Sequence, residues 1–254
     1  MEWAYRSDIG RVRSHNEDSI TVQALDAERG FVVVADGMGG HKAGDVASCL
    51  AAEVVSEKLQ AVDARSLTPV QLKDEIVGGM QRANELVLKK SQEDESMRGM
   101  GTTLVVAVVR AENIVIGNIG DSRAYLISEG TYRQLTQDHS LVNELLNAGE
   151  ITEVEARDHP QKNMIMRAVG TDRDVEPDVT EHVWATGDYL LVCTDGLTDM
   201  VSDEQIHATI QRDETIDWKA DELMRLALEA GGTDNISLAL VKRTAVSAPD
   251  EKAR

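Results

Sequence analysis

The sequence contains few cysteine, proline and aromatic residues. Its 254 residues include two cysteines, four prolines, one phenylalanine, three tryptophans and four tyrosines. Two cysteines without CxxC spacing make neither a disulfide framework nor a zinc motif. Because Cys49 and Cys193 both lie in apolar stretches, we expect two buried thiols. With so few aromatic residues, the core must be built mainly from Val, Ile, Leu, Ala and Met.

Positive charge is also scarce. The chain has 26 Lys and Arg against 45 Asp and Glu, a formal net charge of −19, and no basic run. This balance argues against nucleic acid or an anionic membrane as a partner. The chain starts without a basic, then apolar, segment, and its longest apolar runs are far below the about 20 residues that span a bilayer. We therefore expect a cytoplasmic protein without membrane insertion, and the charge favours a monomer.

Short apolar, β-branched segments bounded by Gly, Asn or Asp recur along the chain and predict strands. They read WAYRS, ITVQAL, FVVVA, TLVVAVVR, IVIGNI, AYLIS, YRQLT, EHVWA, YLLVC and ISLALVKR. Turn signals at 111–113 and 129–130 indicate hairpins, so we expect antiparallel neighbours. No linker divides the chain. We expect one domain over residues 1–244 and a polar tail over residues 245–254.

Four segments have helical periodicity, in two pairs, at about 45–61 and 69–93 and at about 203–211 and 217–230. Val46, Leu50 and Val54 mark the apolar stripe of the first helix, and Pro69 suits the first turn of the second. Strands and helix pairs in this order are not a βαβ alternation. They favour an α+β fold of antiparallel sheets with helices outside. Residues 140–164 form a polar, short-helical insertion, with Ser140 as an N-cap, and such an insertion beside a site can act as a lid.

Four aspartates lie beside Gly or Asn at the ends of apolar segments: Asp36, Asp121, Asp195 and Asp234. Each alone has an ordinary explanation, because Asp-Gly marks turns and Asp caps helices. A strand that is apolar on both faces lies in the core, so its terminal Asp emerges at an end of the packed sheets. If these ends meet, the carboxylates repel one another and resist desolvation.

Two hard divalent cations would relieve that repulsion, since oxygen-rich sites suit Mg²⁺ or Mn²⁺. A pair of ions about 3.5–4 Å apart can activate a bridging water and clamp a phosphoryl group. The cations would also let a chain of net charge −19 accept a phosphate. Arg13 is the best side-chain candidate for a phosphate fork, and a plain surface arginine is the alternative.

At these residues the sequence resembles the metal-dependent protein phosphatase family 2C. The resemblance rests on eight motifs in family order: RxxNED at 13–18, VVADGMGGHKAGDVAS at 33–48, MGTT at 100–103, IGDSR at 119–123, LTQDHSLVNEL at 135–145, RAVG at 167–170, TDGLTD at 194–199 and GGTDNIS at 231–237. The segments DHSLVNELLNAGEIT and HPQKNMI are most similar to stand-alone bacterial members that reverse serine/threonine kinases bearing PASTA repeats.

The resemblance implies an α-β-β-α sandwich of two antiparallel sheets flanked by helix pairs. It implies a phosphatase that hydrolyses phosphoserine and phosphothreonine with a water activated by two Mn²⁺ or Mg²⁺ ions, and a third ion in bacterial relatives. The partners would be phosphorylated proteins, among them a cognate kinase and its substrates. Residues 140–164 fall where the family carries its variable flap.

The same resemblance assigns roles to individual residues. Asp36 would bridge both metal ions, and the Gly37 carbonyl would be a further ligand. Asp195 and Asp234 would complete the pair, and Asp121 with Asp195 would hold the third ion. Asp18 would hydrogen-bond metal waters, while Arg13 would grip the phosphate.

The chain departs from the animal branch of the family at the proposed general acid. Those enzymes have DGH, whereas this chain has Met38 after Asp36 and Gly37, and a thioether cannot donate a proton. His41 is a candidate substitute, with a structural hydrogen bond as the alternative. His139 is open in the same way, and we expect Arg167 to form a structural ion pair.

Other classes fail on residue spacing or lack support. Neither cysteine has an Arg at the distance that a cysteine-based phosphatase requires, because Val55 and Asp199 stand there. The glycines at 37–40 fit neither GxxxxGK[ST] nor GxGxxG. The alternatives that remain are a catalytically dead phosphatase-like binding module and a metal-stabilised structural protein. The presence of all four aspartates and Arg13 argues against both.

Overall fold

The computed structural model describes residues 1–39, 43–62, 67–157 and 159–245. Its strands are β1 (Glu2–Asp8), β2 (Asp18–Asp26), β3 (Arg29–Met38), β4 (Gly101–Thr102), β5 (Leu104–Val109), β6 (Asn113–Ile119), β7 (Arg123–Ser128), β8 (Thr131–Gln134), β9 (Asp178–Val183), β10 (Tyr189–Cys193) and β11 (Ile236–Lys242). Its helices are α1 (Ala43–Ala61), α2 (Pro69–Glu93), a 3₁₀ turn at Glu95–Met97, α3 (Leu141–Asn147), α4 (Glu153–Arg157), α5 (Asp195–Thr198), α6 (Asp203–Ile210) and α7 (Ile216–Glu229).

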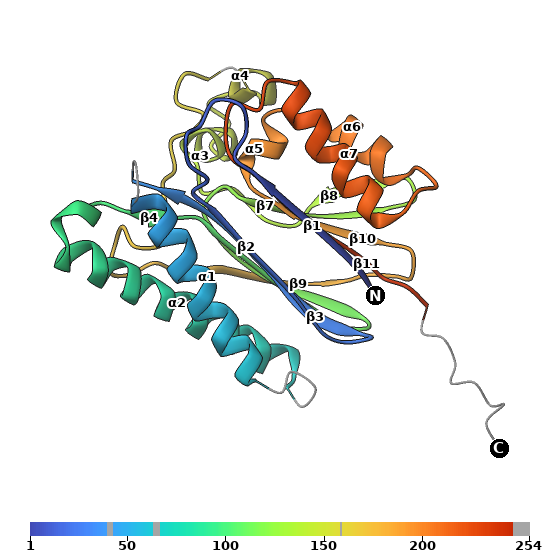
Figure 1. The fold of residues 1–254 in the computed structure, drawn as a ribbon, viewed down its shortest axis with the longest axis horizontal. Helices are drawn as coiled ribbons and strands as arrows, with labels where there is room; N and C mark the ends of the chain where they lie inside the picture. The colour runs from blue at the N-terminus through green and yellow to red at the C-terminus, as the bar shows by residue number, and fades with distance from the viewer. Residues whose placement is uncertain (40–42, 63–66, 158, 246–254) are drawn as a thin grey trace.

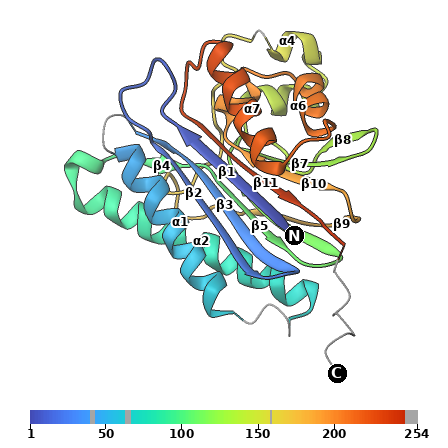
Figure 2. The ribbon, with the colours of Figure 1, turned by 45° about the vertical axis from the view of Figure 1, so that its right-hand side comes forward.

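The strands form two antiparallel sheets. One has the order β1-β11-β10-β7-β8, and the other has the order β2-β3-β5-β6-β9, with β4 paired to β3. The sheets lie face to face, with α1 and α2 outside one and α6 and α7 outside the other (Figures 1 and 2). The predicted α-β-β-α sandwich is therefore confirmed.

The apolar strands alternate between two buried layers, and β3 shows the pattern clearly. Phe31 and Val33 face the core under α1 and α2, whereas Val32 and Val34 face the core between the sheets. A third core lies between the other sheet and helices α5 to α7. Burial on both faces explains why this segment has no polar alternation.

Local signals set several element ends. Pro69 lies in the first turn of α2, as predicted. Thr68, which was not singled out from the sequence, caps this helix in a capping box with Gln71. Ser140 caps α3 by accepting a hydrogen bond from the Asn143 N–H, as predicted. The hairpins expected at 111–113 and 129–130 join β5 to β6 and β7 to β8.

Two predictions were wrong in detail. Cys193 is buried, but Cys49 is exposed on α1, where its thiol contacts Glu53. The buried stripe of α1 runs through Ala47, Ala51 and Val55, whereas Val46, Leu50 and Val54 are only partly buried at its side. Among the helices that the structure describes, none combines the length and hydrophobicity needed to cross a bilayer.

Candidate metal centre

Five carboxylates lie at one end of the sandwich, and each is at or near the end of a strand or a helix. Asp18 begins β2 and Asp36 lies near the end of β3, directly opposite each other in the β2–β3 ladder. Asp121 follows β6, Asp195 begins α5 just after β10, and Asp234 precedes β11. Like charges directly opposite in a ladder are destabilising, so Asp18 and Asp36 need compensation.

The pKa of Asp36 shows how closely these groups approach one another. Asp36 as a residue is partly exposed, but its carboxyl group lies among other protein atoms. Burial raises the pKa of Asp36 well above its ordinary value, and the charges of the other four aspartates raise it further. The structure thus brings together the four aspartates chosen from the sequence, with Asp18 beside them.

The neighbouring carboxyl groups are perturbed in the same direction. Burial, followed by repulsion from Asp195 and Asp138, raises the pKa of Asp121 to about 7. Burial also raises the pKa of Asp18 to about 7, partly opposed by hydrogen bonds. For Asp195, burial and the charges of Asp199 and Asp234 raise the pKa to about 6. Without a cation, the site therefore resists full ionisation.

The donor set fits hard cations. The buried atoms Asp18 Oδ1 and Asp195 Oδ1 have no hydrogen-bond partner in the described part of the chain, which is costly unless another group binds them. In the described residues, no three His, Cys, Asp or Glu side chains are already grouped tightly enough to hold one ion. This is compatible with Mg²⁺-type sites, which use one or two carboxylates and several waters. Asp36, Asp195 and Asp234 could therefore hold a pair of ions, with the Gly37 carbonyl beside them.

Hydroxyl groups fix the backbone around Asp36. The Thr103 hydroxyl accepts a hydrogen bond from the Asp36 N–H at 2.9 Å and shares another with Ser122 at 2.7 Å. Thr102 donates to the Asp36 carbonyl at 2.8 Å. Ser122 adjoins Asp121, so this buried network links two strand ends that carry candidate ligands.

Gly37 is required by close packing. A Cβ there would lie 2.1 Å from the Gly44 carbonyl oxygen and 2.6 Å from the Glu17 carbonyl oxygen. Both neighbours are backbone atoms, so the start of α1 packs directly on Gly37. The absence of a side chain lets the first turn of α1 approach the candidate metal centre.

Arg13 lies beside the cluster, but not as a free phosphate fork. Its guanidinium pairs with Asp234 at 2.6 Å, while about half of the Arg13 side chain stays exposed. This hydrogen bond raises the pKa of Arg13. The only cationic candidate named from the sequence thus neutralises one of the candidate ligands. His41 lies outside the described residues.

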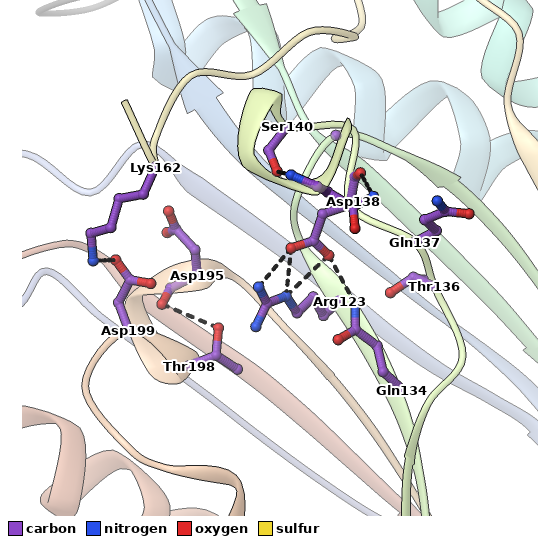
Figure 3. Close-up of polar contacts among 12 residues, drawn as sticks. Arg123, Gln134, Thr136, Gln137, Asp138, Ser140, Lys162, Asp195, Thr198 and Asp199 are labelled. Carbon is purple, nitrogen blue, oxygen red and sulfur yellow. Dashed lines mark hydrogen bonds and ion pairs between the residues drawn. The ribbon is translucent and has the colours of Figure 1, made fainter. Parts of the chain in front are cut away.

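A cavity of about 810 Å³ adjoins Asp121 and Asp195 and extends beneath the 140–164 segment. Two ion pairs line it, one on each side of Asp195: Lys162 from that segment pairs with Asp199 at 3.0 Å, and Arg123 donates to Asp138 with contacts of 2.6–3.0 Å (Figure 3). The sequence did not single out Asp199, although its position one helical turn after Asp195 was a usable signal. Nor did it single out Thr103, Thr194 or Asp138, whose roles depend on contacts distant in sequence.

The fold and the carboxylate cluster agree with the comparison to known families. The family model for protein phosphatase 2C matches residues 10–230. The chain therefore belongs to the protein phosphatase 2C family, whose members depend on metal ions, and the resemblance seen in the motifs is confirmed.

Within this family, the chain is a homologue of the stand-alone bacterial serine/threonine phosphatases. It is 42% identical over 243 residues to the serine/threonine phosphatase stp of Listeria monocytogenes serotype 4b, covering 96% of both chains. The structure of the serine/threonine phosphatase Stp1 from Staphylococcus aureus matches with a TM-score of 0.91 and 37% identity, covering 96% of this chain and 95% of that one. The catalytic domain of the phosphatase PstP in complex with two manganese ions matches with a TM-score of 0.82 and 35% identity, covering 96% of this chain and 98% of that one.

Proposed function

We propose that this protein is a metal-dependent serine/threonine phosphatase that hydrolyses phosphoserine and phosphothreonine in proteins. One observation carries the proposal: five carboxylates from separate chain segments meet at one end of the sandwich, and two of their buried oxygens have no partner in the described part of the chain. Similarity over nearly the full length to serine/threonine phosphatases supports the reaction class.

We assign the metal ligands as Asp36, Gly37, Asp195 and Asp234, with Asp121 and Asp195 for a third ion. When bound, Mn²⁺ or Mg²⁺ would supply a nucleophilic water at neutral pH and positive charge for the phosphate. Asp36 would serve both ions of the pair.

The remaining residues position groups around the phosphate. Asp18 is anchored by the Thr194 hydroxyl at 3.0 Å, which leaves its other oxygen free to accept a hydrogen bond from water. Arg13 can turn from Asp234 to a substrate phosphate, because its side chain is half exposed and its guanidinium presents several donors. Met38 cannot protonate the leaving alkoxide, and His41 stays our prediction for that proton.

The wider setting is also part of the proposal. Residues 1–244 would form one catalytic domain, followed by a polar tail at 245–254, and residues 140–164 would be the substrate-facing flap. We expect a cytoplasmic monomer whose partners are a serine/threonine kinase and the proteins that the kinase phosphorylates. The net charge of −19 supports the absence of nucleic-acid partners.

The test measures phosphate release from a phosphothreonine peptide and from a phosphotyrosine peptide, each with Mn²⁺ and with EDTA. We expect rapid release only from the phosphothreonine peptide with Mn²⁺. The Asp36→Asn and Asp234→Asn variants should lose at least about 100-fold in kcat/KM, whereas Asp174→Asn, an exposed carboxylate away from the cluster, should match the wild type. A loss of this size in kcat/KM is expected because bound metal ions supply several kcal/mol of charge stabilisation. Full activity in EDTA would refute the mechanism, and equal rates on phosphotyrosine would refute the substrate class.

A further inference from the structure

His139, which the sequence left open between a structural and a functional role, lies at the base of the 140–164 segment. Its side chain is only 7% exposed. The residue immediately precedes the cap of α3, and its carbonyl accepts a hydrogen bond from the Met166 N–H at 2.7 Å. Ser140 and Ile165 form an antiparallel bridge next to this bond. The two ends of the flap are therefore joined at His139.

His139 also binds both backbone polar groups of Gly120, the N–H and the carbonyl. The His139 N–H donates to the Gly120 carbonyl at 2.9 Å, and the Gly120 N–H donates to His139 Nδ1 at 3.0 Å. Gly120 has a φ of +105° and directly precedes Asp121. A glycine in this region has wide backbone freedom, so these contacts restrict the direction in which Asp121 leaves the strand.

The hydrogen bond from the Gly120 N–H to Nδ1 defines the tautomer of His139. A backbone N–H can only donate, so Nδ1 must be unprotonated and Nε2 must carry the hydrogen. Nε2 lies 3.1 Å from Asp178 Oδ2 at the start of β9. Arg167 Nη1 also lies 3.1 Å from Nε2, but it cannot donate to a nitrogen that carries a hydrogen, so it donates to Asp178 Oδ1 and to the Glu176 carbonyl, each at 3.0 Å. Burial lowers the pKa of His139, which favours this neutral form. Asp178 and Arg167 thus orient the imidazole so that Nδ1 faces Gly120.

We propose that His139 is a positioning residue for Asp121, linking the base of the flap to the residue that would hold the third ion. The inference rests on the proposed function, because it takes Asp121 as a metal ligand. The imidazole acts through the Gly120 peptide and does not itself touch the carboxylate. On the other side of the same turn, the Ser122 hydroxyl shares a hydrogen bond with the Thr103 hydroxyl at 2.7 Å, so buried polar groups hold the residues on both sides of Asp121.

Two variants test the contacts of Nδ1 and Nε2 separately. In His139→Asn, the side-chain oxygen stands near the place of Nδ1 and can still accept from Gly120, while the contact with Asp178 is lost. In His139→Gln, the amide reaches the place of Nε2 and can donate to Asp178, but no acceptor faces Gly120. Asn84→Ala is the matched control, because Asn84 is a buried side chain that accepts the Gly170 N–H at 2.7 Å in a loop without candidate ligands.

The readout is Mn²⁺ binding by isothermal titration calorimetry on the full chain, with folding checked by circular dichroism. We expect His139→Gln to weaken the binding of at least one ion by about 10–100-fold, the range seen when a group that orients a metal ligand is removed. His139→Asn should stay within about threefold of the wild type, as should Asn84→Ala.

The outcomes distinguish this inference from the proposed function. If the wild type binds Mn²⁺ and His139→Gln binds every ion equally well, the inference alone is overturned. It is also overturned if folded His139→Asn binds Mn²⁺ more than about threefold more weakly than the wild type, a comparison that does not need the Gln variant to fold. A wild type that binds no Mn²⁺ would overturn the proposed function, and the inference with it.

Discussion

Neutralising Asp121 is expected to make the metal-free protein more stable while it impairs the enzyme. The side chain is buried, and its pKa is raised to about 7 by burial and by the charges of Asp195 and Asp138. Asp121→Asn keeps the shape of the side chain and removes its charge. The new amide can donate to either neighbouring carboxylate, so it need not be left without a partner.

The size of the effect follows from the pKa. A shift from 3.8 to about 7 corresponds to at most about 4 kcal/mol, because one pKa unit is about 1.4 kcal/mol. Neighbouring carboxylates take up part of this energy by adjusting their own ionisation, so we expect about 2 kcal/mol. In a chain of this size that gain raises Tm by roughly 4–8 °C.

The sign of the pH dependence is fixed by the direction of the shift. A carboxyl group whose pKa is raised by folding contributes stability below the pKa of the unfolded chain and loses that stability as pH rises through the folded value. The advantage of Asp121→Asn should therefore grow between about pH 4 and pH 7 and stay constant above. Thermal unfolding in EDTA, measured from pH 5 to pH 8.5, records this difference.

Asp138→Asn provides a control for which the expected change in Tm has the opposite sign. The Asp138 carboxylate is bound by the Arg123 guanidinium at 2.6 Å, so its removal leaves a partly buried cation without its carboxylate and should lower Tm. If Asp121→Asn lowers Tm in EDTA at pH 8, or if its advantage does not change with pH, the argument from carboxylate repulsion is refuted.

Two further substitutions test the supports of the site. Thr103→Val removes the acceptor of the buried Asp36 N–H and the bond to Ser122. We expect the free energy of unfolding, measured in urea, to fall by about 1–3 kcal/mol and the rate of phosphate release to drop tenfold or more. Unchanged values would contradict the role of this hydroxyl. Gly37→Ala places a Cβ 2.1 Å from a backbone oxygen, so we expect a Tm lower by more than about 5 °C and almost no hydrolysis. In contrast, Gly78 lies inside α2, and a Cβ there would meet only the flexible end of the Lys58 side chain from α1, so Gly78→Ala should leave both measurements near those of the wild type.

Much of the fold could be predicted because its signals are local. The α2 segment at 69–93 has a proline and a capping box at its start and apolar residues with the helical period, and the helix runs over Pro69–Glu93. The face of α1 was harder to predict. Its large residues Leu50 and Val54 are only partly buried at the side of the helix, while Ala47 and Ala51 are buried against the sheet. Small side chains at these positions let the helix approach the sheet closely. Hydrophobicity alone does not reveal this preference for small volume.

The carboxylate cluster could be predicted for a similar reason. Strands that are apolar on both faces must be central, so an aspartate directly after such a strand has to emerge at an end of the sandwich. The pairings that depend on three-dimensional packing were not available from the sequence. The bond between Thr103 and the Asp36 N–H joins residues 67 positions apart, and the pairing of Arg13 with Asp234 spans 221 positions. Neither pairing has a local pattern that would indicate it.

The division of the acidic side chains between the two sheets has a mechanical consequence. Asp18 and Asp36 belong to one sheet, while Asp195 and Asp234 flank strands of the other. The width of the gap between the two groups is therefore set by the middle apolar layer, in which Val34 and Ala239 are fully buried. A bulkier residue in that layer would push the two sheets apart and so change the spacing of the acidic groups without replacing any of them.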